Sequence, residues 1–207
     1  MLKPQANAHR ECLSFDGFWE FRPQHDGEDA DWSNGFDPRF RLAVPGSWNE
    51  QIHELRFFFG RGWYQRRVHL PHSFLAAGRR IFLHVGAVSQ NAEVWVNGQA
   101  VGRHRGGHLP CEFDITEALA GDSSALVVIM VDQVLSDDNL PAGTARRAED
   151  RLGFKKSAPD VPYDFFPFGG IHRPVSISSR AERHLERIRV DTDLDGDAGR
   201  ITVRAQA

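Results

Sequence analysis

The feature that most constrains the fold of this chain is a succession of short alternating segments bounded by glycine and proline. Apolar side chains alternate with other residues at Leu13 to Phe21, Trp63 to Leu70 and Arg80 to Val85. A period of two places successive side chains on opposite faces of an extended strand, so each segment predicts a half-buried strand. No long stretch has the 3.6-residue period of a helix, and Asp114 to Leu119 predicts one helical turn at most.

The segment around Asn97-Gly98 is the clearest local signal. Both positions suit the positive φ angles of a type I′ turn, which predicts a hairpin between Glu93 to Val96 and Gln99 to Val101. Ala125 to Val131 is continuously apolar and predicts a strand covered on both faces, and Pro174 to Ser178 predicts another strand. Many short strands separated by turns favour an all-β fold, with a jelly-roll-like antiparallel β-sandwich as the expected form.

Two regions do not fit one compact sandwich. Leu135 to Pro162 is polar and contains several prolines, which favours either a mobile surface loop or a segment that reaches over a neighbouring domain. Ile188 to Thr192 and Arg200 to Ala205 predict two strands, and a hairpin by itself is marginally stable. We therefore expect residues 1–182 to form the sandwich and residues 183–207 to start a second β-domain that the chain leaves incomplete.

Composition and charge exclude several classes of function. Lys and Arg number 25 against 28 Asp and Glu, so the net charge of −3 lacks the basic footprint of a nucleic-acid-binding protein. No apolar run approaches the roughly 20 residues that cross a bilayer, and the N-terminus lacks the apolar stretch of a secretory signal. We expect a cytoplasmic protein with no nucleic-acid or membrane partner.

The cysteines and histidines give no convincing metal site. Cys12 and Cys111 are too few for a disulfide framework or a four-ligand zinc site, and the sequence leaves open whether they pair. His104 and His108 have the spacing of zinc ligands on a helix, but Gly106-Gly107 between them would break a helix. We expect structural histidines, no metal and no cofactor.

Four motifs follow one another in the order of a known family. They are VPGSWN at Val44 to Asn49, WYQR at Trp63 to Arg66, a VNG hairpin with a Gly-Gly turn and DIT at Glu93 to Thr116, and DFFPFGGIHRPV at Asp164 to Val175. Together they resemble the N-terminal sugar-binding domain of glycoside hydrolase family 2. The VPGSWNEQ, WYQRRV and DFFPFGGIHRPV segments are most similar to the β-glucuronidase branch of that family.

The resemblance implies a domain order and a reaction. In the family the sandwich is followed by an immunoglobulin-like domain and then by a TIM barrel. The resemblance implies that residues 183–207 are the start of the immunoglobulin-like domain. Two glutamates of that barrel carry out retaining hydrolysis of terminal β-linked sugars. The resemblance therefore implies no catalytic residue in this chain, which alone is expected to be inactive. Its implied partners are a carbohydrate substrate, its own immunoglobulin-like and barrel domains, and another copy in a homo-oligomer of the whole protein.

The resemblance also implies a substrate contact. Asp164 matches an aspartate that reaches into the active site of the barrel and bonds sugar hydroxyls, and Tyr163 stands where β-glucuronidases usually have a histidine. Phe165, Phe166 and Phe168 are expected at a seam with the barrel or facing the sugar. Gly169-Gly170 would permit close backbone approach.

The sequence allows three alternative functions and predicts one further contact. Arg173 is expected to anchor the DFFPFGGIHRPV segment through an ion pair. Because Tyr163 departs from the β-glucuronidase pattern, a β-galactosidase-type member of the family is an alternative. A free-standing carbohydrate-binding module is another, and it would bind sugar through exposed aromatic side chains without any further domain. A structural sandwich with no sugar site is the third.

Overall fold

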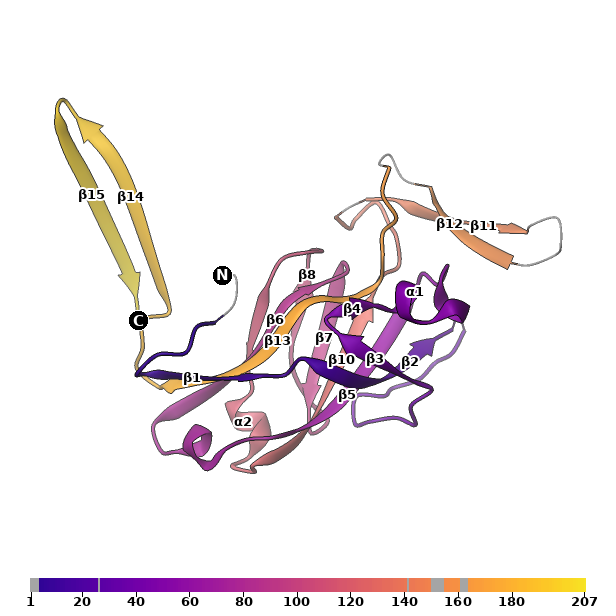
Figure 1. Ribbon diagram of the computed structural model, residues 1–207, viewed down its shortest axis with the longest axis horizontal. Helices are drawn as coiled ribbons and strands as arrows, with labels where there is room; N and C mark the ends of the chain where they lie inside the picture. The colour runs from indigo at the N-terminus through magenta and orange to yellow at the C-terminus, as the bar shows by residue number, and fades with distance from the viewer. Residues whose placement is uncertain (1–3, 26, 141, 150–154, 161–163) are drawn as a thin grey trace.

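The computed structural model describes residues 4–25, 27–140, 142–149, 155–160 and 164–207 (Figure 1). Within these ranges, strands form a sandwich of a five-stranded and a six-stranded antiparallel sheet, together with two separate hairpins. The all-β expectation and the jelly-roll-like antiparallel sandwich are confirmed.

The first sheet has the strand order β1-β13-β6-β9, with β4 also paired to β13. Its strands are β1 (Arg10–Ser14), β4 (Gly46–Ser47), β6 (Arg79–Val88), β9 (Cys111–Asp114) and β13 (Gly170–Ala181). The strand predicted at Pro174 to Ser178 is thus the middle of the longer β13. Its pairing with β1 and β6 joins the two ends of the sandwich sequence in one sheet.

The second sheet has the order β3-β2-β5-β10-β7-β8. Its strands are β2 (Gly17–Gln24), β3 (Phe40–Val44), β5 (Arg61–His69), β7 (Asn91–Val96), β8 (Gln99–Arg105) and β10 (Ser124–Asp132). Asn97 and Gly98 have φ angles of 50° and 79°, which confirms the predicted turn between β7 and β8.

The strand predicted over Leu13 to Phe21 is wrong in one respect, because the chain changes sheets inside it. β1 belongs to the first sheet and β2 to the second. Gly17 has a φ of +130°, and the Asp16 carboxylate accepts a 2.7 Å hydrogen bond from the amide of Val175 on β13. The crossing therefore depends on a contact with a distant strand, which alternation of side chains cannot reveal.

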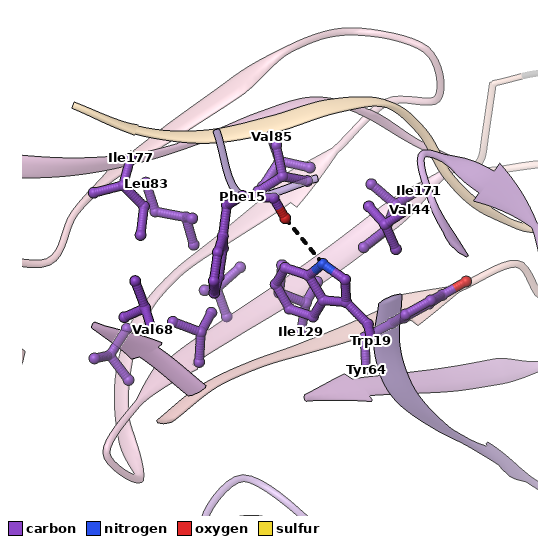
Figure 2. Close-up of a cluster of buried hydrophobic side chains, with 14 of the residues drawn as sticks. Phe15, Trp19, Val44, Tyr64, Val68, Leu83, Val85, Ile129, Ile171 and Ile177 are labelled. Atoms are coloured by element: carbon purple, nitrogen blue, oxygen red, sulfur yellow. Dashed lines mark hydrogen bonds between the residues drawn. The ribbon is translucent and has the colours of Figure 1, made fainter. Parts of the chain in front are cut away.

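The core lies between the two sheets, where Trp19, Trp48 and Tyr64 are fully buried. Figure 2 shows apolar side chains of both sheets meeting around Trp19, whose indole nitrogen donates a 3.1 Å hydrogen bond to the carbonyl of Phe15. A smaller cluster covers the other face of the second sheet, where Trp32 packs over Trp63 and Met130. Strand β10 is therefore covered on both faces, as its continuous apolar sequence predicts.

The helices are short. They are α1 (Trp48–Gln51), α2 (Thr116–Leu119) and the 3-10 turns η1 (His53–Leu55) and η2 (His72–Leu75). Helix α2 is the single turn that the sequence predicts, and the Asp114 carboxylate accepts a 3.0 Å hydrogen bond from the amide of Thr116. None of the helices among the described residues is long and apolar enough to span a membrane.

The polar region after Leu135 contains regular structure that neither sequence-based alternative included. Strands β11 (Thr144–Glu149) and β12 (Lys155–Asp160) pair in antiparallel register, with Ala145 opposite Pro159. This hairpin projects from the same end of the sandwich as α1 (Figure 1). Its sequence has no apolar alternation, so the periodicity that predicts half-buried strands is missing here.

The predicted C-terminal hairpin is confirmed as β14 (Arg187–Asp195) and β15 (Ala198–Gln206), and it extends away from the sandwich (Figure 1). Val190 lies opposite Val203, and Thr192 opposite Ile201, so their side chains share one face. The large apolar side chains of that face are 55% to 78% exposed, at Ile188, Val190, Leu194, Ile201 and Val203. We call these five residues the apolar face of the hairpin.

Candidate functional site

The segment from Asp164 to Gly169 leads into β13 beside helix α1. Asp164 is exposed, and its carboxylate forms no hydrogen bond or ion pair with any residue that the structure describes. Tyr163, the other predicted substrate contact, lies outside the described residues. A carboxylate in this state has all its acceptor positions available to a ligand with hydroxyl groups.

The backbone of this segment is fixed from two sides. The amide of Gly169 donates a 2.7 Å hydrogen bond to Asn49 Oδ1, and the carbonyl of Gly169 accepts a 3.1 Å bond from the Trp48 amide. On the other side, Gly170 donates a 2.9 Å bond to Ser89 Oγ, and the Gln133 side chain donates to the carbonyl of Pro167. These bonds hold the segment that carries Asp164 against the sandwich.

The two glycines are required by close packing, as the sequence predicts. A Cβ atom added at Gly169 would overlap Gln133 Oε1 and the indole ring of Trp48. At Gly170 it would overlap the carbonyl oxygen of Gly46, and Gly170 has a φ of +140°. Any larger residue would therefore move this segment away from α1.

Aromatic rings surround the segment. The ring centroid of Phe166 lies 5.4 Å from that of Phe59 and 4.8 Å from that of Phe168. Phe166 is partly buried by these contacts, whereas Phe165 and Phe168 are 52% and 40% exposed. The three predicted phenylalanines therefore do not belong to the core of the sandwich. They form the base of a surface that is largely open to solvent.

A hollow of about 600 Å³ lies against these rings. Phe57, Phe166 and Phe168 supply its apolar wall, and Glu50, His53 and Arg56 add charged or polar groups. Apolar rings beside a few polar groups are the usual composition of a site for an organic ligand such as a sugar. Together with the unpaired Asp164 carboxylate, this end of the sandwich can offer both stacking surfaces and hydrogen-bond acceptors.

Arg173 is anchored differently from the prediction. Its Nη1 donates a 3.2 Å hydrogen bond to the backbone carbonyl of His108, and it makes no ion pair with the described part of the chain. The partner is a carbonyl because the loop between β8 and β9 faces Arg173 with backbone and not with a carboxylate. The predicted ion pair is not found among the described residues, although the anchoring itself is present.

The histidines serve the packing of this loop. His104 Nε2 lies 2.8 Å from the Gly106 carbonyl oxygen, and the rings of His108 and His172 stack at 5.6 Å. Burial first, and then the nearby His108, lowers the pKa of His172 to about 4. Among the residues for which the structure gives positions, no group of three or more His, Cys, Asp or Glu could hold a metal ion.

Neither Cys12 nor Cys111 forms a disulfide bond. Cys12 lies on β1 and Cys111 on β9, at the two ends of the strand order of the first sheet. Burial raises the pKa of the Cys111 thiol to about 12. The sequence left open whether Cys12 and Cys111 pair. They do not, because two strands, β13 and β6, separate them in the sheet.

Several residues of this site were missed by sequence reasoning. Phe57 and Phe59 belong to a run of three phenylalanines that no motif singled out. Gln133 and Ser89 gave no signal, because their importance comes only from the hydrogen bonds to Pro167 and Gly170. Asn49 belongs to the VPGSWN motif, and that motif was the one sequence signal for its hydrogen bond to Gly169.

Fold and site together define a two-sheet antiparallel β-sandwich with an aromatic hollow at one end, close in the chain to a carboxylate that has no partner among the described residues. The family model for the sugar binding domain of glycosyl hydrolases family 2 matches residues 12–181, and the chain belongs to this family. The resemblance identified from the four sequence motifs is thereby confirmed.

Curated relatives and solved structures agree with this assignment. The chain is 33% identical to the β-glucuronidase of Canis lupus familiaris and 34% identical to that of Sus scrofa. Each alignment covers 96% of this chain and 33% of the relative, so the chain spans about a third of the length of these proteins. The β-D-glucuronidase of Dictyoglomus thermophilum superposes with a TM-score of 0.81 and 32% identity, over 100% of this chain and 34% of that one.

Proposed function

We propose that this chain is the non-catalytic sugar-binding domain of a β-glucuronidase-like retaining exo-β-glycosidase. In this proposal the domain supports a catalytic barrel and presents Asp164 to the terminal β-linked sugar. The two carboxyl groups that retaining hydrolysis requires would be supplied by the barrel. The chain alone would then hydrolyse nothing, and it needs no cofactor.

The observation that carries the proposal is the state of Asp164. Its carboxylate is exposed and unpaired within the described chain, yet the backbone that follows it is tied to Asn49, Trp48, Gln133 and Ser89. An exposed carboxylate three residues before the anchored backbone of Pro167 is available to bind a ligand. One carboxylate can accept hydrogen bonds from two neighbouring sugar hydroxyls.

The aromatic surface supports the second part of the proposal. Phe168 is exposed and lines the hollow together with Phe57 and Phe166, and the exposed Phe165 precedes Phe166 in the chain. Exposed apolar side chains grouped around a hollow are typical of an interaction surface. We assign this surface to the seam with the barrel, so that the barrel and the hollow would enclose the sugar from two sides.

We further propose that residues 1–182 form the sugar-binding domain and residues 183–207 the start of an immunoglobulin-like domain. β13 ends at Ala181 and β14 begins at Arg187. The apolar face of the β14–β15 hairpin is uncovered by the rest of the described chain, and a strand pair with one apolar face normally packs against a second sheet. The β-glucuronidase names of the relatives favour this branch over a β-galactosidase type.

The proposal is tested by replacing Asp164 in the whole enzyme. Asp164→Ala should lower kcat/KM for a chromogenic β-glucuronide by at least about tenfold, which is about 1.4 kcal/mol of transition-state stabilisation. Asp138→Asn, at an exposed aspartate with no described partner, serves as the control and should leave turnover unchanged. Unchanged turnover in Asp164→Ala would contradict the proposed contact.

The binding-module alternative is tested with this chain alone. We expect no hydrolysis of the β-glucuronide and no measurable affinity for glucuronate or galactose at the aromatic hollow. Millimolar or tighter binding that Phe168→Ala abolishes would favour the free-standing module instead.

A further inference from the structure

A second hollow lies at the opposite end of β13 from Asp164. It has a volume of about 480 Å³ and is bounded by residues 7–10 on one side and by residues 180–185, which follow β13, on the other. Its charged and titratable lining consists of Arg10, Arg180, Arg183, His9 and His184, and no carboxylate lines it. In a chain with a net charge of −3, this is a local concentration of positive charge.

Two of these arginines are cross-strand neighbours. Arg10 on β1 pairs with Arg180 on β13, and Arg180 pairs in turn with Arg80 on β6. Directly opposite residues in antiparallel strands point to the same face of the sheet, where like charges destabilise the pairing. A row of three arginines therefore requires negative charge nearby.

Carboxylates of β9 and α2 pair with two members of this row, because Glu117 of α2 also lies 3.9 Å from Arg80. Arg80 Nε donates a 2.6 Å hydrogen bond to Asp114, and Arg180 Nη2 is paired with Glu112 while its guanidinium lies 3.6 Å from the ring centroid of Phe82. Arg10 has no carboxylate partner among the residues that the structure describes. Arg10 is thus the member of the row that borders the hollow without an ion pair in the described part of the chain, although Glu182 adds negative charge nearby.

The guanidinium groups also carry unused donors. Nε of Arg10 and Nε of Arg180 are both shielded from solvent and have no hydrogen-bond partner, and the Arg180 side chain as a whole is only 5% exposed. Buried donors in native proteins are nearly always satisfied by protein, water or a bound ion. Glu112 Oε2 beside Arg180 is also buried without a partner, so the donors available to a ligand in the hollow are the terminal nitrogens of Arg10 and Arg183, which line it.

We propose that this hollow binds an oxyanion of the phosphate type. A tetrahedral dianion offers several acceptor oxygens, and guanidinium groups bind such oxygens with charge-assisted hydrogen bonds. Arg10 would supply the main contact, and the exposed Arg183 would close the site from the turn after β13. His184 is positioned by contacts of its Nδ1 with the carbonyl of Ala181 at 2.7 Å, so its ring is held at the rim.

The place of the hollow gives the anion a structural consequence. The turn of residues 181–186 connects the sandwich to β14, and the hollow lies between this turn and the N-terminal segment of β1. An anion bound to both sides would hold the turn against the sandwich and restrict the direction in which the β14–β15 hairpin leaves it. This site does not depend on the function proposed for Asp164.

The test measures phosphate binding to this chain by calorimetry and by thermal unfolding. Chloride keeps the ionic strength constant in both measurements. Phosphate at about 100 times its Kd should raise the Tm by about 5 °C, because a ligand that binds only the folded state stabilises that state. Arg10→Gln should weaken phosphate affinity at least about tenfold. Arg103→Gln removes the same charge from β8, where Arg103 pairs with Glu93, and should leave affinity unchanged.

A purely structural role for Arg10 is distinguished by the Tm without phosphate. Arg10→Gln removes one of two opposed like charges, so its Tm in chloride should equal or exceed that of the parent. A lower Tm together with unchanged phosphate affinity would overturn the proposal, as would the absence of any phosphate-specific binding. Tighter binding of the monoanion glucuronate than of phosphate would overturn the assignment to a phosphate-type anion.

Discussion

The amide of Gly169 donates a 2.7 Å hydrogen bond to Oδ1 of Asn49, a residue 120 positions earlier in the chain. The side-chain amide of the same Asn49 donates to the carbonyls of Leu55 and Phe58, at 2.8 and 3.1 Å. One buried side chain therefore connects helix α1, the segment after it and the segment that carries Asp164. Asn49 also lines the aromatic hollow, so the same buried residue contributes to both the wall and the anchoring of the site.

Asn49→Ala should destabilise the chain by about 3 kcal/mol, because it leaves several buried amide and carbonyl groups without partners. The free energy of unfolding is measured by urea denaturation. Gln51→Ala on the same helix removes two hydrogen bonds with Ala43 that are exposed to water, and it should cost less than about 1 kcal/mol. Equal losses in the two variants would contradict the role assigned to Asn49.

Gly169→Ala should be more severe, with a loss of at least about 3 kcal/mol, because the added methyl group would overlap Trp48 and Gln133 in a closely packed interior. Gly199→Ala is the matched control, since a Cβ at Gly199 meets nothing within 4 Å. Thermal unfolding of both variants compares them directly. A neutral Gly169→Ala would mean that the segment before β13 is free to move.

The stability of the chain should fall as the pH drops from 7.5 to 5. Burial and His108 lower the pKa of His172 to about 4 in the folded state, whereas an unfolded histidine titrates near 6.5. Between these pH values His172 is protonated in the unfolded chain but neutral in the folded chain, so acid favours unfolding. The stabilisation linked to His172 is therefore present above pH 6.5 and is lost as the pH falls toward 4. At pH 5, protonation of His172 in the unfolded chain lowers the free energy of unfolding by about 2 kcal/mol relative to neutral pH.

His172→Gln should remove that part of the pH dependence, as measured by urea denaturation at the two pH values. The exposed His53 provides the comparison, and His53→Gln should retain the dependence of the parent. If both variants keep the same slope, the burial of His172 does not control its protonation.

Leu194→Lys should change the free energy of unfolding of this chain by less than about 0.5 kcal/mol, because Leu194 is 78% exposed on the apolar face of the hairpin. In a protein that completes a second β-domain over this face, the same change should cost at least about 2 kcal/mol. Ile177→Lys, at a fully buried core position, should prevent folding in either case. A large loss for Leu194→Lys in this chain would mean that the hairpin packs against the sandwich.

Sequence reasoning succeeded where neighbouring residues are enough to define the structure. The turn at Asn97-Gly98 follows from the φ angles that these two residues tolerate, and the strand at Ala125 to Val131 follows from its apolar run. The Gly169-Gly170 pair was predicted to permit close approach, and the structure places Trp48, Gln133 and Gly46 where any side chain would overlap them.

Sequence reasoning failed where the partner lies far away in the chain. The alternating pattern continues from β1 into β2, although the chain changes sheets at Asp16 through a bond to Val175. Arg173 was expected to find a carboxylate and instead binds the His108 carbonyl. The β11–β12 hairpin went unrecognised because its sequence has no apolar alternation.

The sequence by itself indicated an all-β protein, because strand periodicity and turn chemistry are local properties, and its four ordered motifs carried the resemblance to glycoside hydrolase family 2. Only the tertiary structure decided which groups meet, such as Asn49 with Gly169, or Arg10 with Arg180. Such contacts join segments separated by more than a hundred residues, and these segments meet only when both sheets pack around one core.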